Sequence, residues 1–127
     1  MRKTLLGLIA LVLTAFSFTA VSPAHAATTE ALNCVYSGPN VDRTDGTMTV
    51  FITSDNRIQA DVTFHDGKDR DWTWKFNHNG DLSAGPNSAK GGFSVSRTFY
   101  NFTGPDSIHF NVVNAASTVE CNSTISI

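Results

Sequence analysis

Two short runs in which apolar and polar residues strictly alternate lie close together near the middle of the chain. In the first, every second residue from Ile58 to Phe64 is apolar, and in the second the apolar positions are Trp72, Trp74 and Phe76. Successive side chains of a β-strand point to opposite faces. Each run therefore predicts a strand with one apolar face and one polar face.

The segment between the two runs, His65–Asp71, is polar and only seven residues long. A segment of this kind predicts the connection of an antiparallel hairpin, with the two runs paired side by side. We expect this hairpin to form the centre of the fold, because it contains both tryptophans of the chain.

Shorter runs of the same kind predict the remaining strands. Asn79-Gly80 favours a two-residue hairpin turn after the strand that contains both tryptophans, since both turn positions need a positive φ. No segment has the period of an amphipathic helix. About seven or eight short strands are expected in all, so the chain is predicted to be all-β, as a small antiparallel β-sandwich or barrel. The further strands are predicted at residues 32–36, 47–53, 93–102, 108–112 and 119–127.

Residues 83–92, which read SAGPNSAKGG, interrupt this pattern. The segment is rich in glycine, serine and other turn formers, and it predicts the longest loop of the domain. Long loops on a rigid sheet often carry function.

The N-terminus has the three regions of a secretory signal peptide. Arg2 and Lys3 precede an apolar run, and Pro23-Ala24-His25-Ala26 has the small-x-small form of a cleavage site. We therefore expect residues 1–26 to be cleaved and residues 27–127 to form a single secreted domain, in a periplasm or in the medium, with no membrane span after cleavage. About 101 residues remain, which is enough for one hydrophobic core.

The two cysteines, Cys34 and Cys121, are expected to form a disulfide in an oxidising compartment. Because they lie near the two ends of the domain, the bond would tie its first strand to its last. The sequence has no Cys-x-x-Cys pair, which leaves redox catalysis and a thiolate metal site without support.

The expected mature domain has seven basic and eleven acidic residues, a net charge of −4 with histidine neutral. The basic residues are scattered singly. A nucleic-acid partner is therefore not expected, because nucleic-acid binding needs a concentrated basic surface.

The aromatic row of Trp72, Trp74 and Phe76 has two interpretations. It is either part of the core, since large aromatic side chains bury extensive apolar area, or an exposed platform on which sugar rings stack. In the second case Trp72, Trp74, Lys75 and His78 would form the ligand-binding residues.

No metal or other cofactor is expected, although Asp66, Asp69 and Asp71 suggest calcium, which prefers oxygen ligands. Their spacing does not match the helix-flanked calcium loop, and Lys68 and Arg70 lie between them. A solvated, self-neutralising hairpin tip accounts for these charges better than a calcium site does. The three histidines of the expected domain are too far apart along the predicted strands for a shared metal ion; they are His65, His78 and His109.

No catalytic motif is present: there is no Gly-x-Ser-x-Gly and no phosphate-binding glycine loop. A pair of carboxylates for glycoside hydrolysis requires a separation of about 5 to 10 Å that a sequence does not fix. The carboxylates that could form such a pair are Asp61, Asp81, Asp106 and Glu120.

Three functions are consistent with these patterns. The first is a secreted, non-catalytic module that binds a glycan or another cell-surface component through the aromatic strand. The second is a small secreted factor that binds a protein through residues 83–92, such as an inhibitor of an extracellular hydrolase or an immunity-type protein. The third is a small hydrolase.

Overall fold

The computed structural model describes residues 26–37 and 44–127. They form nine β-strands, one or two more than the alternation alone predicts. The predicted signal peptide, apart from Ala26, lies outside the described residues. None of the described residues belongs to a helix with the length and apolar character that crossing a membrane requires. The strands are β1 (Thr28–Ala31), β2 (Asn33–Tyr36), β3 (Thr44–Ile52), β4 (Arg57–Asp66), β5 (Asp71–His78), β6 (Asp81–Lys90), β7 (Phe93–Asn101), β8 (Ser107–Asn114) and β9 (Val119–Ser126).

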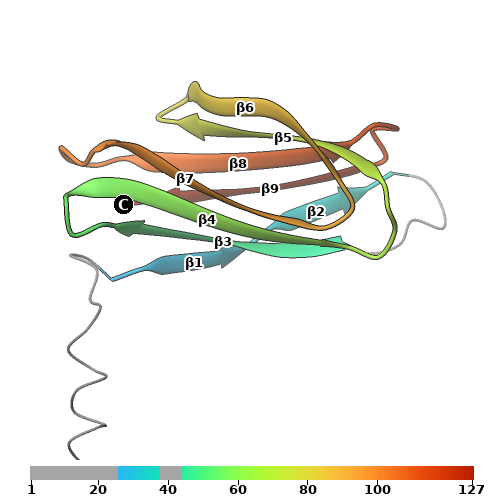
Figure 1. The fold of residues 1–127 in the computed structure, drawn as a ribbon, viewed down its shortest axis with the longest axis horizontal. Helices are drawn as coiled ribbons and strands as arrows, with labels where there is room; N and C mark the ends of the chain where they lie inside the picture. Colours follow the sequence, from blue (N-terminus) through green and yellow to red (C-terminus); the bar gives the residue numbers. More distant parts are fainter. Residues whose placement is uncertain (1–25, 38–43) are drawn as a thin grey trace, which may run out of the picture.

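The strands form two antiparallel sheets, which confirms the predicted all-β fold and identifies it as a sandwich (Figure 1). Sheet A has the order β1-β3-β4-β7, and sheet B has the order β2-β9-β8-β5-β6. The edge strands β1 and β2 lie on one side of the sandwich, and β6 and β7 lie on the other. Residues 28–36 thus contribute to both sheets, because the chain passes from β1 to β2 at the buried Leu32.

The core fills the space between the sheets with the apolar residues of the alternating strands. Each fully buried large apolar side chain contributes about 1.5 to 3 kcal/mol to folding. Aromatic rings from both sheets meet there, as when Phe64 of β4 packs edge-on against Trp72 of β5 with ring centroids 4.7 Å apart. The most buried core residues include Met48, Val50, Ile52, Ile58, Val62, Phe64, Trp72, Phe76, Ile108, Phe110, Val112 and Ile125.

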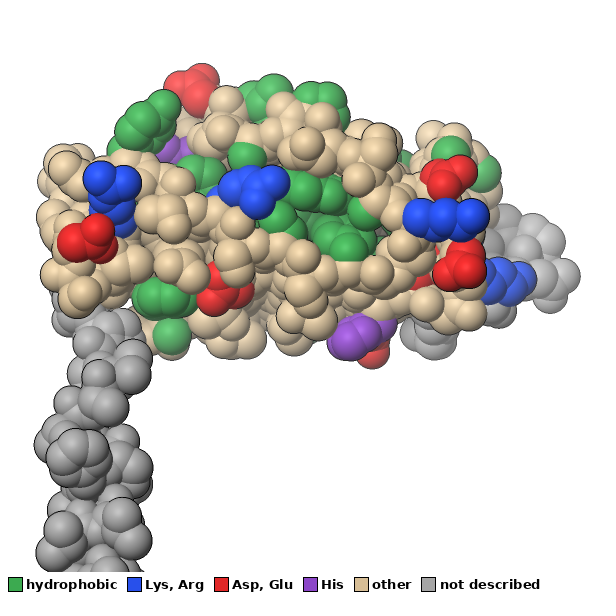
Figure 2. All heavy atoms as spheres, in the orientation of Figure 1, with side chains coloured by type: hydrophobic (Ala, Val, Ile, Leu, Met, Phe, Trp, Pro, Cys, Tyr) green, Lys and Arg blue, Asp and Glu red, His purple; other side chains and the backbone are tan. Residues whose placement is uncertain are grey.

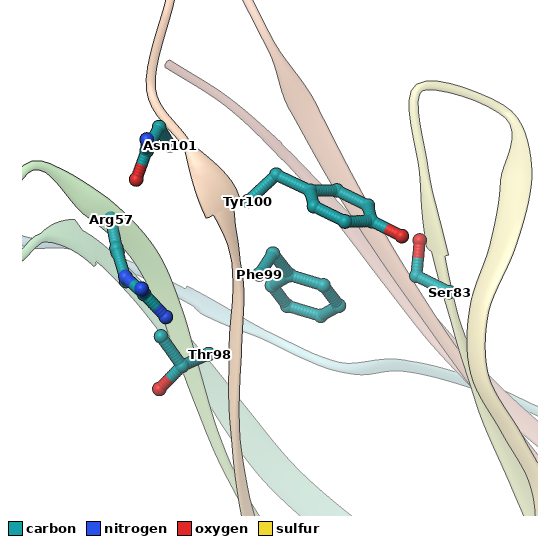
Figure 3. Close-up of a pocket in the computed structure, with 6 residues that line it drawn as sticks. All are labelled: Arg57, Ser83, Thr98, Phe99, Tyr100 and Asn101. Atoms are coloured by element: carbon teal, nitrogen blue, oxygen red, sulfur yellow. The ribbon is translucent and has the colours of Figure 1, made fainter.

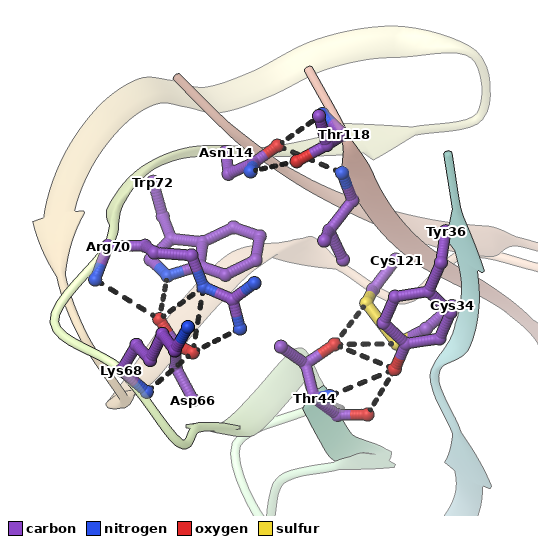
Figure 4. Close-up of polar contacts among 11 residues, drawn as sticks. Cys34, Tyr36, Thr44, Asp66, Lys68, Arg70, Trp72, Asn114, Thr118 and Cys121 are labelled. Atoms are coloured by element: carbon purple, nitrogen blue, oxygen red, sulfur yellow. Dashed lines mark hydrogen bonds and ion pairs between the residues drawn. A yellow bond between two sulfur atoms is a disulfide. The ribbon is translucent and has the colours of Figure 1, made fainter. Parts of the chain in front are cut away.

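A disulfide joins Cys34 of β2 to Cys121 of β9, as predicted, and the two cysteines are direct partners in the register of sheet B. Beside the disulfide, the Tyr36 hydroxyl donates a hydrogen bond to the Thr44 carbonyl at 2.9 Å and accepts one from the Thr44 amide at 2.9 Å (Figure 4). These bonds link β2 to β3 and so close this side of the sandwich. A structural disulfide suits an oxidising, extracellular environment.

The predicted central hairpin is wrong. The two alternating runs do form strands, but β4 pairs with β3 and β7, whereas β5 pairs with β6 and β8. The connection after Asp66 therefore carries the chain from sheet A to sheet B. The two apolar faces meet each other across the core instead of lying side by side.

The predicted loop at residues 83–92 is also wrong, because residues 81–90 form the edge strand β6. Two register shifts against β5 show that β6 contains extra residues, at which the strand bulges. Gly85 occupies one bulge with φ +101°, and a Cβ there would lie 2.7 Å from the carbonyl oxygen of Trp74. Glycine and proline occur in strands at such edges and bulges, so the composition that suggested a loop marks an irregular edge strand instead.

The Asn79-Gly80 turn is confirmed. Asn79 has φ 51° and Gly80 has φ 87°, and the two residues connect β5 to β6 as a tight hairpin. The turn places the end of β5, including His78, directly beside the start of β6.

Candidate functional site

A cleft of about 410 Å³ opens between β6 and β7, on the side of the sandwich opposite the disulfide. Figure 2 looks onto this side and shows apolar side chains uncovered between the two layers. The cleft residues come from both sheets and are mostly polar (Figure 3); they are Arg57, Ser83, Thr98, Phe99, Tyr100 and Asn101.

β-bulges shape both walls of the cleft. On β7, the register against β4 shifts so that residues 98 to 101 face only residues 57 to 59. The extra residue lies at Phe99-Tyr100, and the alternation of buried and exposed side chains along β7 breaks after it, where both Tyr100 and Asn101 are exposed. On β6, Ser83 lies in the bulge between Ala84 and Leu82. Bulges re-aim side chains and are frequent beside functional sites.

Tyr100 is the most exposed large aromatic side chain among the described residues, at 77% of its full accessibility. Its neighbour Phe99 is only 8% exposed and packs against Phe76 in the core. The Tyr100 hydroxyl points across the cleft toward Ser83 (Figure 3). Because Phe99 is fixed in the core, the neighbouring Tyr100 ring is held at the surface of β7 and exposed to solvent.

His78 supports Tyr100 from the end of β5. Its ring lies 6.0 Å from the Tyr100 ring and stacks on Phe99 at 5.8 Å with an interplanar angle of 23°. Its Nε2 lies 2.7 Å from the carboxylate of Asp106. The backbone of Asp106 exchanges hydrogen bonds with Ile127, so the imidazole is held against the C-terminal part of the domain. The structure thus places His78, predicted from the sequence as a ligand residue, behind the cleft and not among its lining residues.

Arg57 supplies a positive charge at the opposite end of the cleft. Its Nε lies 3.7 Å from Asp55, and both side chains are more than half exposed. The Thr53 hydroxyl donates a hydrogen bond to the same carboxylate and holds the pKa of Asp55 below its usual value. Exposed ion pairs of this geometry contribute little to stability, so Arg57 is free to exchange partners.

The aromatic row predicted from the sequence belongs to the core. Trp72 is 1% exposed and Trp74 is 5% exposed, and both rings contact aromatic side chains of sheet A. Each ring is also covered by a guanidinium, Arg70 over Trp72 at 5.3 Å and Arg97 over Trp74 at 5.1 Å. A ring in this position has no free face on which to stack a sugar. Of the two interpretations, the structure supports the core.

Lys75 lies between Trp74 and Phe76 in the sequence of β5, and its side chain is exposed on the outer face of the strand. It faces away from the core and is not one of the cleft residues. The four ligand residues predicted from the sequence are therefore not brought together at one surface.

In the acidic connection after β4, the Asp66 carboxylate contacts protein groups of the same segment rather than being left free for a cation (Figure 4). The Asp66 side chain is inaccessible to solvent and pairs with Arg70. It accepts hydrogen bonds from the Lys68 amide at 3.0 Å and from the Trp72 indole Nε1 at 2.8 Å. Its oxygens are thus already engaged, while Asp69 is exposed. Three or more metal-ligating side chains do not converge anywhere in the described part of the chain.

The pKa of Asp66 reflects this environment. Burial raises the pKa of the carboxyl, but the Arg70 guanidinium together with the amide and indole donors outweighs burial and holds the pKa below its usual value. The carboxylate therefore stays ionised, and it organises the chain crossing between the sheets.

The carboxylates considered for hydrolysis are dispersed. Asp61 lies on the outer face of sheet A beside Gln59, and Glu120 lies on the outer face of sheet B, where Asn111 donates to it. Asp106 is engaged with His78 and with the Ser107 amide. None of these carboxylates lines the cleft.

Sequence reasoning missed Tyr100 and Arg57. One signal was present: Phe99 and Tyr100 are adjacent bulky aromatic residues in a strand that otherwise alternates. Two consecutive residues of a regular strand cannot face the same side. One of the two rings had to be exposed unless the strand bulged, and the structure has both the bulge and the exposed ring.

Comparison of the chain with protein-family models, with curated proteins and with solved structures finds no match.

Proposed function

We propose that the protein is an exported, non-catalytic module that binds a glycan in the cleft around Tyr100. The observation that carries the proposal is the 77% exposure of an aromatic ring that is anchored on both sides, by Phe99 in the core and by the His78–Asp106 pair. Leaving a large aromatic side chain in water forgoes its burial energy, and tyrosine is enriched at surfaces where proteins bind partners.

The chemistry of the cleft suits a sugar. The C–H face of a pyranose ring packs on an aromatic face, and its hydroxyls need both donors and acceptors. Ser83, Thr98 and Asn101 supply hydroxyl and amide groups beside Tyr100. A small set of polar groups around an apolar contact is the usual composition of a small-ligand site.

Export is part of the proposal. The basic, apolar and small-x-small regions of residues 1–26 support a cleaved signal peptide, and the Cys34–Cys121 disulfide supports an oxidising destination. Mass spectrometry of the exported protein should give an N-terminus at Ala27. An N-terminus at Met1 would contradict this part of the proposal.

Binding is tested by screening the oxidised domain against a glycan array and measuring the hits by calorimetry. Tyr100→Ala should weaken binding by about tenfold or more, since loss of one aromatic stacking partner costs about 1 to 3 kcal/mol. Val35→Ala is the matched control, because Val35 is another exposed apolar residue, on the opposite edge strand of sheet B. Equal binding by Tyr100→Ala and the wild type, or no glycan binding at all, would refute the proposal.

A second candidate function is protein binding through β6. The segment predicted as a loop is instead an edge strand, and among the described strands only β5 pairs with it. Its Leu82 is 55% exposed. Exposed edges of this kind accept a strand from a partner protein. Leu82→Asp should then abolish inhibition of a purified extracellular hydrolase that the wild type inhibits, while Tyr100→Ala should leave it unchanged.

A further inference from the structure

The cleft around Tyr100 is lined by a single side chain that is charged at neutral pH. Of its six lining residues, Arg57 is basic, none is acidic, and the others are neutral. The lining residues themselves thus carry one positive charge, and the carboxylate that faces it, Asp55, lies outside the cleft lining, in a domain whose overall charge is negative. A local charge opposite in sign to the whole domain selects ligands by charge complementarity.

The guanidinium of Arg57 is available for a ligand. Within the part of the chain that the structure describes, its terminal nitrogens carry no hydrogen bond, and its one ion pair is the 3.7 Å contact through Nε to Asp55. Asp55 already accepts a hydrogen bond from Thr53. The planar fork of an arginine matches a carboxylate, with two parallel N–H···O bonds.

Arg57 and the Tyr100 ring line the same cleft from the two sides of β7. Arg57 pairs in register with Asn101, the residue after Tyr100. Figure 3 shows the guanidinium directed toward Thr98, on the opposite side of the β7 ribbon from the Tyr100 ring and Ser83. A ligand that extends from the Tyr100 ring across β7 within this cleft would bring a substituent to the guanidinium, beside Asn101.

From this geometry we infer that the glycan carries a carboxylate, as a uronic acid residue does, and that Arg57 binds that carboxylate while Tyr100 packs on the sugar ring. The inference rests on the proposed function, because it assigns the chemical class of the glycan that the same cleft binds. Arg57 is then the residue that determines specificity.

The test compares two ligands that differ only in charge. Oligogalacturonic acid and hyaluronan oligosaccharides provide uronic acids of two stereochemistries, and their methyl esters provide neutral forms with the same rings. Calorimetry at low ionic strength should show that the wild type binds at least one acid at least about tenfold more tightly than its ester.

Arg57→Gln should remove this preference and bind the acid and the ester alike. Lys75→Gln is the matched control, because it removes the same charge from the outer face of sheet B, away from the cleft. Its preference for the acid should equal that of the wild type. Thermal unfolding of both variants verifies that each is folded.

The outcomes separate the inference from the function on which it rests. If Tyr100-dependent binding is found for neutral glycans, or is equally tight for the acid and its ester, the carboxylate inference is overturned. The proposed function then still stands. A preference for the acid that Arg57→Gln retains would also overturn the inference. Absence of binding to any acidic or neutral glycan would overturn both.

Discussion

The indole Nε1 of Trp72 donates a hydrogen bond of 2.8 Å to the carboxylate of Asp66. Asp66 is the last residue of β4 in sheet A, and Trp72 is the second residue of β5 in sheet B. The bond therefore spans the point at which the chain changes sheets. It orients the connection so that the indole ring enters the core next to Phe64.

Replacing Asp66 should destabilise the domain strongly. Asp66→Ala leaves the Arg70 guanidinium and the Trp72 indole without their acceptor, and breaking a buried ion pair of this kind costs about 3 kcal/mol. Urea unfolding followed by circular dichroism measures the loss. Asp69→Ala, in the same connection but exposed, should change the free energy of unfolding by less than about 0.5 kcal/mol. Equal effects of the two substitutions would show that the Asp66 contacts do not stabilise the crossing.

Asp66 also predicts a specific pH dependence. Its pKa in the folded protein is lowered below that of an aspartate in an unfolded chain, which is about 3.9. The folded state therefore binds the proton more weakly, and the ionised carboxylate contributes stability above the unfolded pKa. That contribution is lost as the pH falls through the folded pKa. The difference in unfolding free energy between the wild type and Asp66→Asn should shrink from pH 5 to pH 2, and a constant difference would contradict the assignment.

The alternation of Ile58–Phe64 and of residues 72–76 was sufficient to predict two strands and their apolar faces, but not that the tryptophan face is buried. Period two is a local property of a chain, so it can be recognised without knowing the partners. Whether the strands pair or face each other depends on the connection, and here on the contacts of Asp66. Charged residues such as Asp66 and Arg70 are also common at the tip of a hairpin. The sequence pattern therefore does not distinguish a hairpin from a crossing between the sheets.

The disulfide was predictable for a different reason: the expected domain has only two cysteines, so the pairing has one solution. The cleft was not predictable in this way. It depends on bulges at Ser83 and at Phe99-Tyr100, and a bulge shifts the register by one residue without a strong composition signal.

Removing the disulfide should cost a large part of the stability. The bond closes a loop with a sequence separation of 87 residues, for which the chain-entropy model gives roughly 4 to 5 kcal/mol. Typical domains have only about 5 to 15 kcal/mol in total. The variant in which Cys34 and Cys121 are both alanine should unfold at a much lower urea concentration than the oxidised wild type. A shift equivalent to less than about 1 kcal/mol would mean that the Tyr36–Thr44 bonds and the core hold β2 in place without the disulfide.

The burial of both tryptophans predicts the intrinsic fluorescence. The oxidised protein should emit with a blue-shifted maximum and be quenched only slightly by iodide, because Trp72 and Trp74 are 1% and 5% exposed. Unfolding in urea should shift the emission to the red and restore quenching. Red-shifted, readily quenched emission from the folded protein would place at least one ring at the surface and would revive the tryptophan platform as the binding face.

Gly85 connects the stability of the edge strand to the geometry of the cleft. Alanine at this position requires a left-handed φ of +101° and a Cβ 2.7 Å from the backbone carbonyl oxygen of Trp74, which a side-chain movement cannot relieve. Gly85→Ala should therefore cost about 2 kcal/mol and flatten or detach the bulged part of β6.

Gly67→Ala is the control, since a Cβ there meets no atom within 4 Å and its φ is not in the left-handed region. Ser83 lies two residues from Gly85 on the wall of the cleft, so glycan affinity should fall in Gly85→Ala and stay unchanged in Gly67→Ala. Hydrogen exchange of the β6 amides measures the detachment directly. Wild-type exchange and wild-type affinity in Gly85→Ala would show that β6 accommodates alanine and that the bulge does not position the cleft wall.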